Sequence, residues 1–77
     1  MNEARRKALQ SVITGLRALQ APLDTCIEEE QEYYDNMPEG LQGGEKGELA
    51  QDAINNMEQA RSELEQAVDN LESVLSQ

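Results

Sequence analysis

Histidine, phenylalanine and tryptophan are missing from this chain of 77 residues, and cysteine occurs once, at Cys26. A single cysteine excludes a disulfide bond within the chain, and the lack of histidine removes another of the best protein ligands for transition metals. A nucleophilic Cys26 would need a nearby base such as histidine, which the sequence does not contain. The composition therefore predicts a protein that is not an enzyme and binds no metal ion or other cofactor.

Long apolar runs are absent as well. No stretch approaches the roughly 18 consecutive apolar residues that suggest a membrane-spanning helix, so we expect a soluble protein without a membrane segment. Much of the apolar content is alanine, and only Tyr33 and Tyr34 add aromatic area. A short chain with so thin a core is marginally stable alone, which predicts self-association.

Proline is absent from residues 45–77, and the only glycine there lies in the opening turn. Two apolar rows repeat every seven residues and are offset by three; they are Met57, Leu64 and Leu71, and Ala60, Ala67 and Val74. This heptad pattern is typical of a coiled-coil helix, which requires a partner helix. It predicts a helix over residues 45–76.

Residues 3–36 show the same periodicity. Three rows with a spacing of seven are formed by Leu9, Leu16, Leu23, Glu30 and Met37, by Val12, Leu19, Cys26 and Tyr33, and by Ile13, Ile27 and Tyr34 with Gln20 between them. The phase continues through Pro22 without an inserted residue, which favours one helix over residues 3–36 that is kinked near Pro22. The alternative is a helix that ends at Gln20 and a second with Pro22 in its first turn. Within its row, Cys26 is expected to be a small buried hydrophobe.

Residues 37–44 separate the two helical segments. Pro38 disfavours helix at the residue before it, and the glycines Gly40, Gly43 and Gly44 permit a turn. Leu41 is expected to fold back over the tip. A short loop between helices of similar length predicts an antiparallel hairpin.

The expected fold is all-α. It is a single domain over residues 1–77, an antiparallel, coiled-coil-like hairpin of helix 3–36, loop 37–44 and helix 45–76 that dimerises into a four-helix bundle. The residues expected in the core or the dimer interface are Leu16, Leu23, Ile27, Met57, Leu64 and Leu71.

The net charge of −10 is unevenly distributed. Residues 1–22 carry four basic residues and one acidic residue, whereas residues 23–77 carry two basic and fifteen acidic residues. We therefore expect attraction to basic protein surfaces and no direct binding to nucleic acid. In a hairpin, the basic N-terminus would lie beside Glu65, Asp69 and Glu72.

An acidic segment precedes the loop. The residues expected to bind a partner are Glu28, Glu29, Glu32, Tyr33, Asp35 and Glu39. Their carboxylates predict a negative surface for a basic protein, which could imitate the phosphates of nucleic acid. The alternative is a solvated helix face that only confers solubility.

Two further features of this segment leave alternatives open. Glu30 stands in a row of Leu and Met residues, where a carboxylate must reach solvent, pair with a base or mark an opening of the seam. Tyr33 and Tyr34 either anchor an interface or cap the core, and the register of Tyr34 with Ile13 and Ile27 favours the core.

The loop and its flanks carry a recognisable pattern: an acidic helix ending in E-x-Y/F-D-N-M/L-P-E, a loop of the L-Q-x-x-E-K/R-G-E type and a helix of A-x-x-x-L-E repeats. The matching positions are 32–36, 37–39, 41–42 and 45–48. The pattern resembles a family of small proteins encoded by tailed bacteriophages and prophages, and the resemblance covers about the C-terminal two-thirds of the chain. It implies a phage origin and a hairpin shape. With that origin, the single cysteine and the lack of a membrane segment lead us to expect a location in the bacterial cytoplasm. Family members often have serine where this chain has Gly44, so a helix cap is lost.

The functional hypothesis combines these features. We expect a non-catalytic, phage-derived homodimer that binds and inhibits a bacterial host or defence protein through its acidic surface. The inhibitory role is an analogy with other small acidic phage proteins. The alternative is a structural or assembly subunit whose acidic surface serves only solubility.

Overall fold

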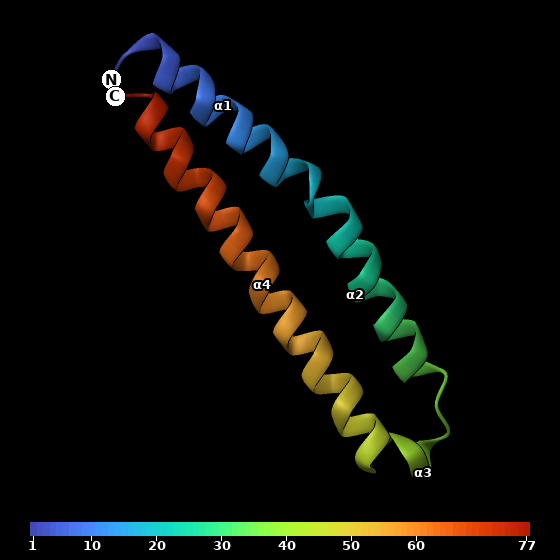
Figure 1. Cartoon of the computed structure of the whole chain (residues 1–77). Helices are drawn as coiled ribbons and strands as arrows, with labels where there is room; N and C mark the ends of the chain where they lie inside the picture. Colours follow the sequence, from blue (N-terminus) through green and yellow to red (C-terminus); the bar gives the residue numbers. More distant parts are fainter.

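The computed structural model covers residues 1–77 and is an elongated helical hairpin measuring 59 × 15 × 13 Å. Its helices are α1 (Glu3–Ala18), α2 (Gln20–Asp35), the single turn α3 (Glu39–Gln42) and α4 (Glu45–Leu75), and there is no strand. α1 and α2 run antiparallel to α4, so both termini lie at one end (Figure 1). The expected all-α hairpin is therefore confirmed. None of the helices is long and apolar enough to cross a membrane.

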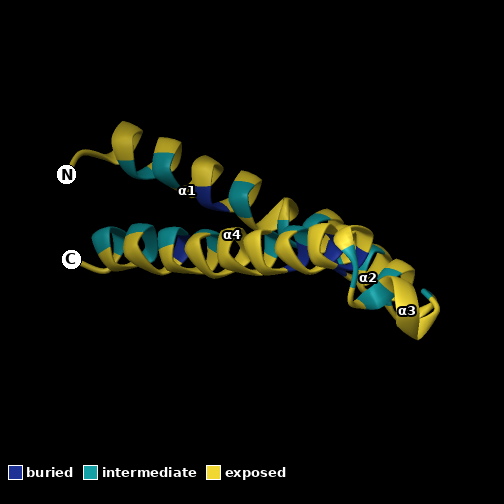
Figure 2. Cartoon of the chain, turned by 90° about the horizontal axis from the view of Figure 1, so that it is seen from below, coloured by how far each residue is buried: buried dark blue, intermediate teal, exposed yellow.

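A narrow apolar seam joins α1 and α2 to α4. The buried apolar residues are Ile13, Ile27, Ala50, Ile54 and Val68. On α1 and α2, Ile13 and Ile27 alternate with half-buried Leu9, Leu16 and Leu23 at spacings of three and four residues, as in a coiled coil. Figure 2 shows the buried positions only where the two arms meet. Of the six residues expected in the core or dimer interface, Ile27 is buried and Leu16, Leu23, Met57, Leu64 and Leu71 are half-buried.

On α4, the row that accompanies Met57, Leu64 and Leu71 in the seam differs from the expected row of Ala60, Ala67 and Val74. The observed row is Gly47, Ile54, Arg61, Val68 and Leu75, in which only Arg61 is exposed. The expected row lies beside the seam, with Ala60 exposed and Ala67 and Val74 half-buried. Both rows are three or four residues from Met57, Leu64 and Leu71, so spacing alone does not separate them. The larger side chains of Ile54 and Val68 fill the space between the arms better than alanine does.

The expected helix 3–36 is divided at Leu19, which has φ −83° and ψ −15°. The Leu19 N–H donates to the carbonyl of Leu16 at 3.1 Å, and the Leu23 N–H donates to the carbonyl of Leu19 at 3.2 Å. Pro22 is the third residue of α2. In this first turn an N–H would have no partner within the helix, so the missing donor of proline costs little. In Figure 2, α1 runs at an angle to α4 while α2 lies along it.

At the tip, the expected loop 37–44 contains the helical turn α3. The expectation that Leu41 folds back over the tip is wrong, because its side chain is 50% exposed. Gln42 turns inward instead, and its Nε2 donates to the carbonyl of Tyr34 at 3.0 Å. The same carbonyl also accepts a hydrogen bond of 3.1 Å from the Met37 N–H, so it has two donors beyond the end of α2. The backbone of Gln42 also packs directly on Gly47, where an added Cβ would overlap the Gln42 carbonyl group and lie 2.7 Å from its Cα.

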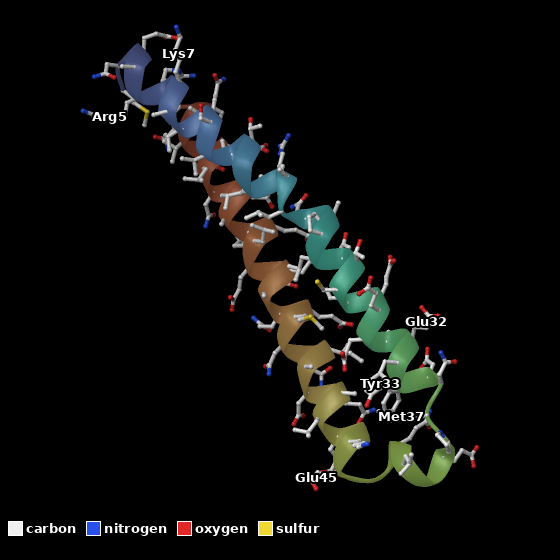
Figure 3. The ribbon with its side chains drawn as sticks, turned by 45° about the vertical axis from the view of Figure 1, so that its right-hand side comes forward. Arg5, Lys7, Glu32, Tyr33, Met37 and Glu45 are labelled. Atoms are coloured by element: carbon white, nitrogen blue, oxygen red, sulfur yellow. The ribbon has the colours of Figure 1, made fainter.

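The other end is held by arginine side chains. Arg6 donates from Nη2 to the carbonyl of Leu75 at 2.7 Å, which satisfies a terminal carbonyl of α4. Arg17 forms an ion pair with Glu72. Arg5 and Lys7, which project from the N-terminal turns in Figure 3, form no ion pair. The basic N-terminus was expected to lie beside Glu65, Asp69 and Glu72. Of these three acids, only Glu72 pairs with a basic residue of α1, and that residue is Arg17.

The close approach at Gly47 generates a stability prediction. Replacing Gly47 with alanine should lower the free energy of unfolding by about 1–3 kcal/mol, because the new methyl group would force α3 away from α4. Urea denaturation followed by far-ultraviolet circular dichroism measures this change. The matched control is Gly40→Ala at the same tip, where an added Cβ would have no neighbour within 4 Å and the change should stay within about 0.5 kcal/mol. Equal effects of the two substitutions would contradict the packing described here.

Candidate functional site

Four carboxylate residues that were expected to bind a partner lie on the outer side of α2, and a fifth, Glu39, is the first residue of α3 at the tip. All are exposed, and we call them the acidic surface: Glu28, Glu29, Glu32, Asp35 and Glu39. Ile27 and Tyr34 turn toward α4, so residues 28, 32 and 35 fall on the opposite side of α2 at helical spacing. Figure 3 shows Glu32 on the side of α2 that is turned away from α4.

The acidic surface has no basic partner within the chain. The three ion pairs of the molecule join Arg17 to Glu72 and Arg61 to both Asp24 and Glu65. Asp35 Oδ1 accepts a hydrogen bond of 2.9 Å from Gln31 Nε2, a neutral donor one turn away. The carboxylates are therefore free to attract a basic group from outside.

Their position on α2 is also electrostatically unfavourable. The last turn of α2 contains no basic residue, and Glu32 and Asp35 lie near that C-terminal end. The helix dipole carries partial negative charge there and disfavours a carboxylate by about 0.3–1 kcal/mol. Glu28 and Glu32 are four residues apart and repel each other as well. The acidic surface costs the fold stability rather than contributing to it.

Glu30 stays in the seam between the arms. It is half-buried and takes part in none of the three ion pairs. Of the three alternatives for this residue, pairing with a base is therefore excluded.

The two adjacent tyrosines have different environments. Tyr34 is half-buried, and its hydroxyl accepts a hydrogen bond of 3.1 Å from Gln51 Nε2 on α4. It belongs to the core, as its register with Ile13 and Ile27 predicts. Tyr33 is 52% exposed and lies beside the acidic surface. Only Tyr33 is available to a partner.

A shallow depression of about 300 Å³ adjoins Tyr33, and we call it the tip pocket. It is lined by Tyr33, Asn36, Met37, Pro38, Leu41 and Lys46. Tyr33 and Met37 lie near each other at this end of α2 (Figure 3). Sequence reasoning missed the pocket because it placed Leu41 inside the hairpin. Its apolar lining next to free carboxylates is a combination that suits a protein partner.

Cys26 is exposed, so the expectation that it is buried is wrong. The row Val12, Leu19, Cys26 and Tyr33 lies beside the seam, and all four of its members are exposed. No group of three or more histidine, cysteine, aspartate or glutamate residues is arranged to hold a metal ion.

Comparison with known proteins gives no relative. No family model matches the chain, and no curated protein or solved structure matches it either. The phage resemblance of residues 32–48 therefore stays a prediction.

The electrostatics of α2 can be tested through stability. The double substitution Glu28→Gln and Glu32→Gln should raise the free energy of unfolding by about 0.3–0.5 kcal/mol at low salt, since it relieves repulsion within α2 and with its dipole. Glu72→Gln is the matched control, because it removes the ion pair with Arg17 and should lower stability by up to about 1 kcal/mol. Both effects should shrink in high salt. Urea titrations at two salt concentrations measure them, and a destabilised double variant would show that these carboxylates support the fold.

Proposed function

We propose that this protein is a non-catalytic protein–protein interaction module that binds a basic surface of its partner. The observation that supports the proposal is the acidic surface: exposed carboxylates without a basic partner in the chain, two of which, Glu32 and Asp35, lie near the end of α2 where the dipole disfavours them. Local features that cost stability are expected where function requires them. A face that only confers solubility needs no such placement, since acids elsewhere would serve equally.

The tip pocket offers apolar side chains that a partner can bury, which the acidic surface does not. Charges at an interface steer association and select a complementary partner, but contribute modestly to affinity. Affinity comes from a few buried side chains, among which tyrosine is enriched. Tyr33 and Leu41 are both half exposed and line the tip pocket. We propose that Leu41 anchors the partner while Glu28, Glu29 and Glu32 steer it, with Tyr33 at the border between the tip pocket and the surface used for self-association.

The origin of the protein is proposed from the resemblance of the loop region to phage proteins, and its inhibitory role from analogy with other small acidic phage proteins. We propose a phage-derived protein that acts in the bacterial cytoplasm and inhibits a host or defence protein. Masking a basic surface is sufficient for inhibition, because it blocks the ligands or substrates that the surface would otherwise attract. The thin core of five buried apolar residues favours a homodimer that forms a four-helix bundle.

A structural or assembly subunit is the second candidate function. The long exposed apolar row beside the seam favours it, since repeated self-contact could build a larger assembly. Sedimentation without partners separates the two functions. A defined dimer supports the interaction module, whereas assemblies that grow with concentration support the structural subunit.

Charge reversal tests the interaction module. The triple substitution of Glu28, Glu29 and Glu32 to lysine should abolish capture of the partner from a bacterial lysate, with helicity unchanged by circular dichroism. The physical reason is that attraction to a basic surface becomes repulsion. Captured proteins are identified by mass spectrometry, and wild-type binding should weaken as salt increases.

The matched control reverses three exposed acids of α4, Asp52, Glu58 and Glu63, none of which forms an ion pair. The net charge is then the same, so only the location differs. If the α4 variant loses the partner equally, or if wild-type binding is the same in low and high salt, the acidic surface is not the binding site.

A further inference from the structure

The two broad faces of the hairpin differ in character. One face carries the side-chain pairs between the arms that lie beside the seam: Arg17 with Glu72, Asp24 with Arg61, and Gln51 with the Tyr34 hydroxyl. We call it the polar face. Its residues are Gln10, Arg17, Asp24 and Gln31 on α1 and α2, and Gln51, Glu58, Glu65 and Glu72 on α4.

The opposite face is apolar along the length of both arms. In an antiparallel helix pair, the positions that flank the seam on the other side also come together. These positions form the apolar face, which consists of Val12, Leu19, Cys26 and Tyr33 on one arm and Ala53, Ala60, Ala67 and Val74 on the other. Val12 is 49% exposed and Leu19 is 56% exposed. No segment of the chain covers this face.

We infer that a second copy of this chain covers the apolar face, with the same face of its own, in an antiparallel arrangement that places the two tips at opposite ends. The inference rests on the homodimer of the proposed function and specifies its surface and orientation. It describes an all-antiparallel four-helix bundle, in which each arm packs on the same arm of the other copy.

The area of the face suits a stable dimer. The Cα atoms extend over 59 × 15 × 13 Å. A whole broad side of the hairpin therefore covers on the order of 900 Å² in projection, similar to the roughly 800 Å² per partner of a standard-size interface. The two apolar rows extend over about 32 Å in the middle of this side. The alanines of α4 allow close approach, since the separation of packed helices depends on the side chains at the contact.

The two rows of the apolar face are self-complementary about one point. Each has four members at a spacing of seven; the row of α1 and α2 has its midpoint between Leu19 and Cys26, and that of α4 between Ala60 and Ala67. The ion pair of Asp24 with Arg61 places these two midpoints at the same level along the hairpin to within about one residue. A single two-fold axis that crosses the hairpin at this level therefore places each row opposite the same row of the second copy.

This axis predicts specific neighbours. Leu19 of one copy faces Cys26 of the second copy, and Val12 faces Tyr33. On the other arm, Ala60 faces Ala67. Large side chains then meet on one side of the bundle and alanines on the other, which keeps the layers filled.

Charge selects the orientation with opposite tips. The tip half, residues 24–55, contains ten carboxylates and one lysine, a net charge of −9. The remaining residues, 1–23 and 56–77, contain five basic and six acidic residues, a net charge of −1. A dimer with its tips together would place two halves of −9 against each other, whereas opposite tips place each acidic half against a nearly neutral one.

Sedimentation equilibrium of two charge variants tests the face. Wild-type protein should be a dimer, and Leu19→Glu should raise the dissociation constant at least roughly 100-fold, because two unpaired carboxylates would be buried. The matched control, Gln10→Glu, places the same charge on the polar face and should leave the dimer intact. Leu19 lies outside the seam and is more than half exposed, so circular dichroism should show both variants fully helical. A monomeric wild type, or a dimer that Leu19→Glu does not weaken, overturns the inference.

Disulfide trapping tests the orientation. Under mild oxidation, Leu19→Cys should form a covalent dimer through Cys26 of the second copy. The two positions are seven residues apart in one chain, about 10 Å along the helix, which is too far for a disulfide within it. Val12→Cys adds a thiol to the same face one heptad away and should not cross-link. Equal cross-linking of the two variants, or none in either, overturns the antiparallel orientation.

The outcome is independent of the acidic surface. None of these substitutions changes Glu28, Glu29 or Glu32, and charge reversal of those residues leaves the apolar face intact. A monomer that still captures its partner in a salt-dependent way refutes the dimer and keeps the interaction module. A dimer that binds the same proteins after charge reversal keeps the dimer and refutes binding through the acidic surface.

Discussion

The packing of five buried apolar side chains along one seam holds this molecule together and orients everything else in it. Ile13, Ile27, Ala50, Ile54 and Val68 are a small core for two arms that together contain most of the chain. Once they face one another, the remaining positions of each helix are assigned to the polar face, the apolar face or the outer side. The acidic surface is an outer-side feature for this reason, and the exposed row through Leu19 and Cys26 is a consequence of the same register.

Heptad spacing predicted two helical arms, and Pro38 with the nearby glycines predicted the break between them, so that together they gave the antiparallel hairpin. The favoured single helix over residues 3–36 is divided at Leu19. Heptad spacing was insufficient to choose between neighbouring rows, because residues 3–36 contain three rows with a spacing of seven. The volume of Ile54 and Val68 on α4 decides which row is buried, and this left Cys26 exposed. The tip shows another limit: Leu41 points outward because the side chain and the backbone of Gln42 occupy the inner position. Such a choice depends on contacts between segments, which a local pattern does not contain.

The two proposed surfaces have different functions: the apolar face serves self-association, and the acidic surface binds the partner. The apolar face extends along both arms and is suited to a symmetrical contact, whereas the acidic surface lies on the outer side of the tip half. The tip pocket borders the apolar face, because Tyr33 belongs to both. In a dimer with opposite tips, the two acidic surfaces would lie in opposite halves of the bundle, about 16 Å apart along its axis at Glu28 and about 38 Å apart at Asp35. Each would then be free to bind a partner, and the module would be bivalent.

The hydrogen bond of Arg6 to the Leu75 carbonyl closes the longest loop among the side-chain hydrogen bonds, with a sequence separation of 69 residues. The hydrogen bond between Gln42 and the Tyr34 carbonyl closes a loop with a sequence separation of only 8 residues. Because the entropic cost of closing a loop grows with its length, contacts near the tip should form early during folding and those of α1 late. Unfolding should follow the reverse order, so the hairpin should open first at the end where the two termini lie. The acidic surface and the tip pocket therefore belong to the part of the chain that acquires its structure first and loses it last.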